Sequence, residues 1–193
     1  MTAQDHSKTK IKICGLRRRE DILAVNEAKP DYCGFIVEFP RSFRSVTADQ
    51  VRELVKELAP EIQPVGVFVN APMELVRTLL DDGTLALAQL HGQEDESYIR
   101  ELKTYTDRPI IKAFSIKTTE DIEKALQSPA DYILLDQGGG GTIAYITANY
   151  GMDVIDSGVA LLSMHSPWEI SSKADIYEAY KGYKAFQKAD WER

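Results

Sequence analysis

The sequence predicts an α/β fold, a (β/α)8 barrel in which parallel strands alternate with helices. Six apolar runs begin near residues 10, 32, 64, 85, 109 and 131, and a helix-like segment separates each from the next. Units of roughly 20 to 30 residues favour parallel strands with right-handed crossovers. Polar residues recur at the strand ends, as a site on one rim of a barrel requires. An open doubly wound sheet fits the alternation too, but no Gly-x-Gly-x-x-Gly follows the first strand, so we expect the barrel, also called a TIM barrel.

The first expected strand, 10–16, alternates apolar and polar side chains. Ile11 and Ile13 share one face, and Lys12 and Cys14 share the other. Cys14 stands at the carboxyl end of the strand, where a glycine and a charged run open a helix. Parallel α/β proteins place their chemistry at this position. By residue frequency alone, a buried and inert cysteine would be the better expectation.

The other elements follow from hydrophobic periodicity and from turn residues. Pro30 ends the first helix, Thr47 caps the second, and Thr118 or Thr119 caps the last. Strands are expected at 32–37, 65–69, 85–90, 109–114 and 131–136, and helices at 21–29, 47–58, 72–80, 96–105 and 118–126.

Composition limits the classes of function. The chain has 193 residues, 44% hydrophobic and 27% charged, which suits one soluble domain over residues 1–193. Two cysteines make no disulfide framework, the tail 1–9 lacks the apolar core of a signal peptide, and no apolar run approaches the roughly 20 residues of a membrane span. A cytoplasmic protein without a membrane partner is therefore expected. The net charge of −7 argues against nucleic acid but leaves an anionic small molecule open, because backbone amides can hold a phosphate.

A glycine run follows the sixth expected strand. Asp136 ends that strand, and after Gln137 come Gly138, Gly139, Gly140 and Gly141. Such a loop lets backbone amides approach a phosphate closely. A flexible linker is the alternative, but a run that leaves directly from a strand ending in aspartate favours a ligand loop.

Several motifs then occur in a fixed order. They are KICGL at 12–16, GF at 34–35, FPRSFR at 39–44, VGVFVN at 65–70, QLHG at 89–92, and LD at 135–136 before the glycines. Over residues 10–142 this set resembles phosphoribosylanthranilate isomerase, the barrel enzyme of tryptophan biosynthesis. The resemblance implies an Amadori rearrangement of N-(5-phosphoribosyl)anthranilate without a metal or organic cofactor.

The resemblance also implies roles for individual residues. Cys14 falls on the family's general base and Asp136 on its general acid. Arg44 falls on the arginine that grips the anthranilate carboxylate, a task that suits its planar donor fork. Ring opening needs a proton on the ribose oxygen, and the iminium must then lose its C2′ proton, so one acid and one base suffice. His91 has a lining or structural role, and Cys33 lies in the core.

The resemblance breaks after Thr142. Residues 143–151 resemble the end of the helix before the last strand, 152–159 resemble that strand with Asp156 in place of a serine, and 175–186 resemble the closing helix. Residues 160–172 have no counterpart. About one strand–helix unit around strand seven, on the order of 30 residues, is therefore missing. Either these residues were left out of the sequence or the polypeptide lost them. We favour omission, because the preceding units carry no compensating changes.

The phosphate site is affected by this break. The loops after strands seven and eight hold the phosphate in barrels of this kind. Here only Ser157 and Gly158, together with the glycine run, remain as candidates.

Other functions compete with the isomerase. A barrel remnant without activity, acting as a binding or structural protein, is favoured by the missing phosphate loop. Related sugar-phosphate epimerases use metal-binding His and Asp at strand ends, and only His91 is placed so. The histidine-pathway Amadori isomerase pairs two aspartates, whereas the first strand here ends in Cys14. The isomerase, as a monomer or homodimer, remains the expectation.

Overall fold

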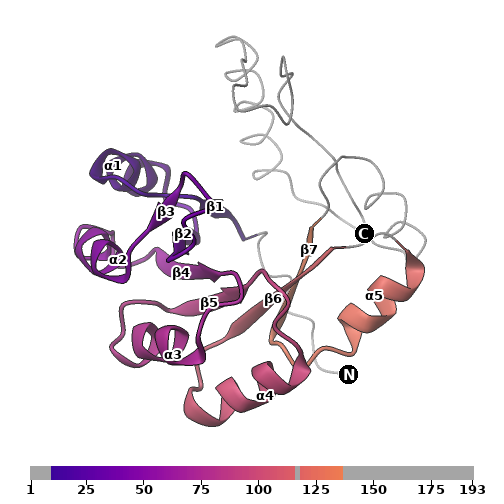
Figure 1. Cartoon of the computed structure of the whole chain (residues 1–193). Helices are drawn as coiled ribbons and strands as arrows, with labels where there is room; N and C mark the ends of the chain where they lie inside the picture. Colours follow the sequence, from indigo (N-terminus) through magenta and orange to yellow (C-terminus); the bar gives the residue numbers. More distant parts are fainter. Residues whose placement is uncertain (1–9, 116–117, 137–193) are drawn as a thin grey trace, which may run out of the picture. The chain divides into compact units, whose positions relative to one another are not determined.

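The computed structural model describes residues 10–115 and 118–136 (Figure 1). The strands are β1 Lys12–Cys14, β2 Tyr32–Val37, β3 Ser45–Val46, β4 Gln63–Phe68, β5 Leu87–Leu90, β6 Ile110–Ser115 and β7 Tyr132–Asp136. The helices are α1 Arg19–Ala28, α2 Ala48–Val55, α3 Met73–Asp81, α4 Glu96–Tyr105 and α5 Thr119–Leu126. The predicted elements at 143–151, 152–159 and 175–186, and the segment 160–172, lie outside the described residues.

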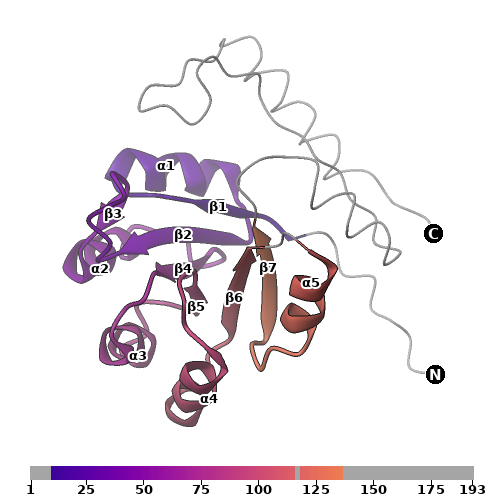
Figure 2. The same ribbon diagram turned by 45° about the vertical axis from the view of Figure 1, so that its right-hand side comes forward.

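All the described strands form one parallel sheet in the order β1-β2-β4-β5-β6-β7, with the short β3 paired to β2. The sheet curves, and the helices lie along its outer side (Figures 1 and 2). Apart from β3, each strand pairs with the next one along the chain. A doubly wound sheet would reverse this order at a switch point. The observed order is therefore that of a barrel wall, and it confirms the predicted class. In the described part of the chain the wall is open, with β1 and β7 at its two ends.

The predicted starts of α2, α4 and α5 are confirmed by their caps. The side chain of Thr47 accepts from the amide of Gln50, and Thr118 accepts from the amide of Asp121, which decides between the two threonines. Asp95 accepts from the amide of Tyr98 and so starts α4 where it was predicted. Each cap satisfies an amide that has no partner within its own helix.

Several bounds differ from the sequence prediction: β1 is limited to Lys12–Cys14, β5 begins at Leu87 rather than 85, and α1 begins at Arg19 rather than 21. Two further differences have a visible cause. The second helix ends at Val55, because the amides of Glu57 and Leu58 bond to carbonyls three residues back and close tight turns. β3 was not predicted. Glu38 adopts a left-handed φ of 48°, and its amide bonds to the carbonyl of Val46, so the loop folds back along β2. These contacts are backbone turns, which hydrophobic periodicity does not reveal.

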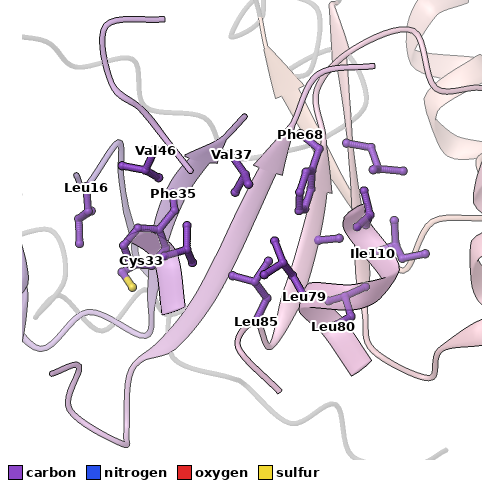
Figure 3. Packing of buried hydrophobic residues seen from close by; sticks show 14 of the residues in the cluster. Leu16, Cys33, Phe35, Val37, Val46, Phe68, Leu79, Leu80, Leu85 and Ile110 are labelled. Atoms are coloured by element: carbon purple, nitrogen blue, oxygen red, sulfur yellow. The ribbon is translucent and has the colours of Figure 1, made fainter. Parts of the chain in front are cut away.

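The hydrophobic core lies between the outer face of the sheet and the helices (Figure 3). Cys33 is fully buried there and belongs to the core, as predicted. Gly66 also faces this layer, since a Cβ there would lie 2.4 Å from Leu85 Cδ1. In the described part of the chain, no helix has both the length and the apolar content that a membrane span requires.

Candidate active site

Cys14 ends β1 and its side chain is exposed. It pairs in register with Gly34, and a Cβ on Gly34 would lie only 2.5 Å from the Cys14 sulfur. The neighbours of Gly34 in β2, Cys33 and Phe35, point into the helix layer, so the thiol lies on the opposite, inner face. The two cysteines therefore differ: burial raises the pKa of Cys33 to about 12, with the nearby Cys14 adding to the rise. Cys14 is not the inert core residue that frequency alone would suggest.

Arg44 lies beside Gly15, the residue that follows Cys14. Gly15 has a left-handed φ of 88°, and a Cβ there would lie 2.8 Å from Arg44 Cδ. Glycine is thus needed both for the turn after β1 and for the approach of the arginine. Cys14 and Arg44 line one cavity of about 550 Å³, so the structure brings these two predicted site residues together.

Two further residues of this cavity were missed by the sequence analysis. Phe43 is 76% exposed, and the Arg44 guanidinium lies 5.0 Å from its ring centroid. Arg17 lies 6.0 Å from the same centroid, and its Nη1 donates to the Phe43 carbonyl at 2.6 Å. An apolar residue between arginines in a polar loop was the available signal. Phe43 therefore holds two guanidinium groups over the cavity.

The cavity carries an excess of positive charge. Arg17, Arg18 and Arg44 line it, with Asp21 as its acidic member. Hydrogen bonds from the amides of Arg17 and Arg18 hold the pKa of Asp21 below its usual range, although burial opposes them. The Asp21 carboxylate therefore binds the backbone amides at the start of α1. Such a cavity favours an anionic ligand group, either a carboxylate or a phosphate.

A second polar cluster joins His91 to β1. Lys12 donates from Nζ to Gln89 Oε1, and Gln89 Nε2 lies 2.8 Å from His91 Nδ1. Gln89 is almost fully buried, and Lys12 is half-buried. Burial lowers the pKa of Lys12, while the Cys14 and Cys33 thiols act in the opposite direction. His91 is thus linked by side chains to the strand that carries Cys14.

A buried ion pair fixes the turn that follows His91. Lys112 Nζ donates to the Gly92 carbonyl at 2.7 Å and lies 3.4 Å from Glu94 Oε2. Glu94 accepts from the amides of Asn70 at 2.6 Å and Gly92 at 2.8 Å. A Cβ on Gly92 would lie 2.5 Å from Asn70 Oδ1, so the turns after β4 and β5 are locked together.

Asp136 is the last residue of β7 and pairs in register with Ser115. Because all strands are parallel, the chain positions of Cys14, His91 and Asp136 fall at the same edge of the sheet. The predicted phosphate residues Gly138–Gly141, Ser157 and Gly158 lie outside the described residues, and their role stays a prediction. Among residues 10–115 and 118–136, no group of three or more His, Cys, Asp or Glu could hold a metal ion.

The sequence model of the family described as "N-(5'phosphoribosyl)anthranilate (PRA) isomerase" matches residues 11–146, well over half of the chain. A second model, "Aminopeptidase I zinc metalloprotease (M18)", matches residues 109–187. The second match covers less than half of the chain and lies mostly outside the described residues. Both matches include Gly138–Gly141, so the glycine run alone does not distinguish the two families.

Curated relatives named N-(5'-phosphoribosyl)anthranilate isomerase support the first match. The chain is 42% identical over 127 residues to that of Thermoanaerobacter pseudethanolicus, covering 66% of this chain and 60% of the relative. It is 43% identical over 141 residues to that of Endomicrobium trichonymphae, covering 69% and 68%. The chain thus spans about 60% of the length of the first of these relatives.

Solved structures show the same likeness. Phosphoribosyl anthranilate isomerase from Thermotoga maritima is 33% identical with a TM-score of 0.59, over 68% of this chain and 62% of that one. Another phosphoribosyl anthranilate isomerase is 31% identical with a TM-score of 0.63, over 74% and 70%. It was solved with reduced 1-(o-carboxyphenylamino)-1-deoxyribulose 5-phosphate.

Proposed function

Because the chain belongs to the N-(5'-phosphoribosyl)anthranilate isomerase family, we propose that the protein is a phosphoribosylanthranilate isomerase. It converts N-(5-phosphoribosyl)anthranilate to 1-(2-carboxyphenylamino)-1-deoxyribulose 5-phosphate. The observation that carries this proposal is the cavity shared by Cys14 and Arg44 at the carboxyl end of β1. This cavity contains an accessible thiol and arginine side chains that can bind an aromatic carboxylate.

The proposed reaction oxidises C2′ and reduces C1′ of the same substrate through a series of proton transfers. Asp136 gives a proton to the ring oxygen, the C1′–O bond breaks, and the nitrogen lone pair forms the iminium. Cys14 then removes the C2′ proton, and that electron pair forms the C1′–C2′ double bond while nitrogen regains its own pair. The enol loses its hydroxyl proton and gains one at C1′, which gives the ketone. Protons and electrons balance within the substrate, so the reaction requires no external oxidant or cofactor.

The remaining groups bind the substrate. Arg44 takes the anthranilate carboxylate through its planar fork, next to the thiol. His91 lines the same edge of the sheet, and the glycine run with Ser157 and Gly158 takes the phosphate. The small phosphosugar is the only partner proposed, and the cytoplasmic location and monomeric or homodimeric state stay predictions.

The test is turnover of the Cys14→Ala variant. Loss of a general base lowers turnover by about 100-fold or more, while the melting temperature stays close to that of the wild type. Retained turnover in a folded variant would remove Cys14 from the mechanism. Arg44→Lys keeps the charge but loses the fork, so KM rises while kcat changes little. An unchanged KM would make Arg44 an ordinary loop charge.

A second function, a binding protein without activity, is favoured by the incomplete coverage of the relatives. A thermal melt with and without millimolar phosphate, and with the reduced product analogue, separates the two. The isomerase is stabilised by mass action when these ligands bind. A chain that shows no shift with either ligand, and no turnover, is the barrel remnant.

A further inference from the structure

The side chains of Lys12, Gln89 and His91 are joined by hydrogen bonds in which donor and acceptor can be assigned. The reaction proposed above does not use this assignment. We propose that Lys12 and Gln89 are positioning residues that hold His91 as the neutral tautomer with its proton on Nε2. This inference rests on the proposed function only in what it says about how His91 would contact the substrate. The tautomer itself follows from the contacts.

The first step concerns the Gln89 amide. Its oxygen and nitrogen are told apart by their partners, because a lysine ammonium donates and cannot accept. Lys12 Nζ faces one end of the amide, so that end is the oxygen. Gln89 is almost fully buried, and an amide flip would set its NH2 group against the ammonium. Burial therefore makes the flip costly.

The second step concerns the imidazole. The other end of the amide, Nε2, lies 2.8 Å from His91 Nδ1. An amide NH2 group donates and cannot accept, so Nδ1 must be the acceptor and carries no proton. A neutral imidazole then has its single proton on Nε2. The order of donors runs from Lys12 through Gln89 to His91.

The ring is held from its backbone as well. The His91 amide donates to the Phe68 carbonyl at 2.7 Å, and the turn beyond it is fixed by the Glu94–Lys112 pair. The backbone position of His91 and the tautomer of its imidazole are therefore both fixed. The Nε2–H of His91 is then a donor, the polarity that suits a sugar or phosphate oxygen in the proposed enzyme. It does not supply a second general base.

The direct measurement is nitrogen-detected NMR of the histidine rings, at a pH well above the ordinary imidazole pKa of about 6.5. The chain has three histidines, and His91→Asn identifies the signals of His91. We expect Nδ1 in the unprotonated range and Nε2 in the protonated range. A ring with its proton on Nδ1 would overturn the proposal without reference to activity.

Variants test each link. Gln89→Glu presents an acceptor to Nδ1, so the proton moves to Nδ1 and the two nitrogen signals exchange ranges. Lys12→Met removes the group that orients the amide, so the two tautomers become mixed. Lys10→Met is the matched control, because Lys10 lies on the same segment, is exposed, and contacts the Tyr32 ring instead. It leaves the His91 spectrum unchanged.

Kinetics distinguish a positioning role from a structural one. Gln89→Met keeps Lys12 and Cys14 but frees the ring, and we expect KM to rise about tenfold, the worth of one hydrogen bond, with kcat nearly unchanged. Wild-type KM in this variant, or an unchanged tautomer in both Lys12→Met and Gln89→Glu, contradicts the proposal. If the wild-type protein shows the expected tautomer but no turnover, the proposed function fails and the tautomer assignment stands. If Lys12→Met does not fold, the wild-type spectrum and Gln89→Glu still decide.

Discussion

Gly34→Ala tests whether the position of the Cys14 thiol matters for turnover. The new Cβ would lie 2.5 Å from Cys14 Sγ, 3.2 Å from its Cβ and 3.3 Å from its Cα. Non-bonded carbon and sulfur atoms prefer at least about 3.5 Å, so the thiol must move by about 1 Å. The cheapest relief is rotation of the exposed Cys14 side chain, because both backbones are held by the parallel pairing of β1 and β2.

The expected loss is large in rate and modest in stability. A displacement of about 1 Å at a reacting group can cost about 100-fold, so we expect kcat to fall by that order. Overpacking of this kind costs about 1–3 kcal/mol of unfolding free energy. The assay is steady-state turnover beside a thermal or denaturant melt of the same preparation.

Gly66→Ala is the matched control. Its Cβ would lie 2.4 Å from Leu85 Cδ1 and 2.7 Å from Phe68 Cε2, on the other face of the sheet and away from Cys14. We expect a similar loss of stability with kcat retained. Wild-type kcat in a folded Gly34→Ala protein, or an equal fall in both variants, would refute the assignment of Cys14 as the positioned base.

Three further predictions concern other groups. A thiol reagent labels the exposed Cys14 quickly and leaves Cys33 unlabelled until denaturation, so Cys14→Ser abolishes the fast phase. Glu94→Ala leaves Lys112 buried without its carboxylate and costs about 3–5 kcal/mol in a denaturant melt, whereas Glu96→Ala, whose partner Arg100 is exposed, costs about 0–1 kcal/mol. Burial alone would raise the pKa of Asp131, but hydrogen bonds from Lys103 and the Ile110 amide outweigh it and lower the pKa. Its contribution to stability is therefore present above the unfolded pKa of about 4 and is lost as pH falls through the folded value, so Asp131→Asn destabilises at neutral pH and matches the wild type in acid.

The sequence predicted the elements whose signals are local. The strand at 32–37 and the helix at 96–105 have the predicted bounds, because a short apolar run marks the first and Asp95 caps the second. β3 and the early end of α2 could not be predicted, since backbone turns set both of them and leave no mark in the hydrophobic periodicity.

The site divides in the same way. Motif order placed Cys14 and Arg44, and the structure brings them to one cavity. Their places at this cavity depend on Gly15 and Gly34, whose missing Cβ atoms make room for Arg44 and for the thiol. Sequence shows a glycine but not the group that occupies its space. For the same reason the stacking of Phe43 and the link from Lys12 to Gln89 became visible only in three dimensions.

Among the residues that the structure describes, those lining the cavity of Cys14 and Arg44 all fall between positions 13 and 44, in β1, α1, their connecting loop and the loop after β2. One continuous stretch of polypeptide therefore encodes an accessible sulfur together with its cationic surroundings. A genetic exchange anywhere beyond codon 44 transmits this stretch whole, whereas the strand ends that carry His91 and Asp136 can be replaced separately. The accessible sulfur and its cationic surroundings are thus inherited as a unit, separately from the strand ends that carry His91 and Asp136.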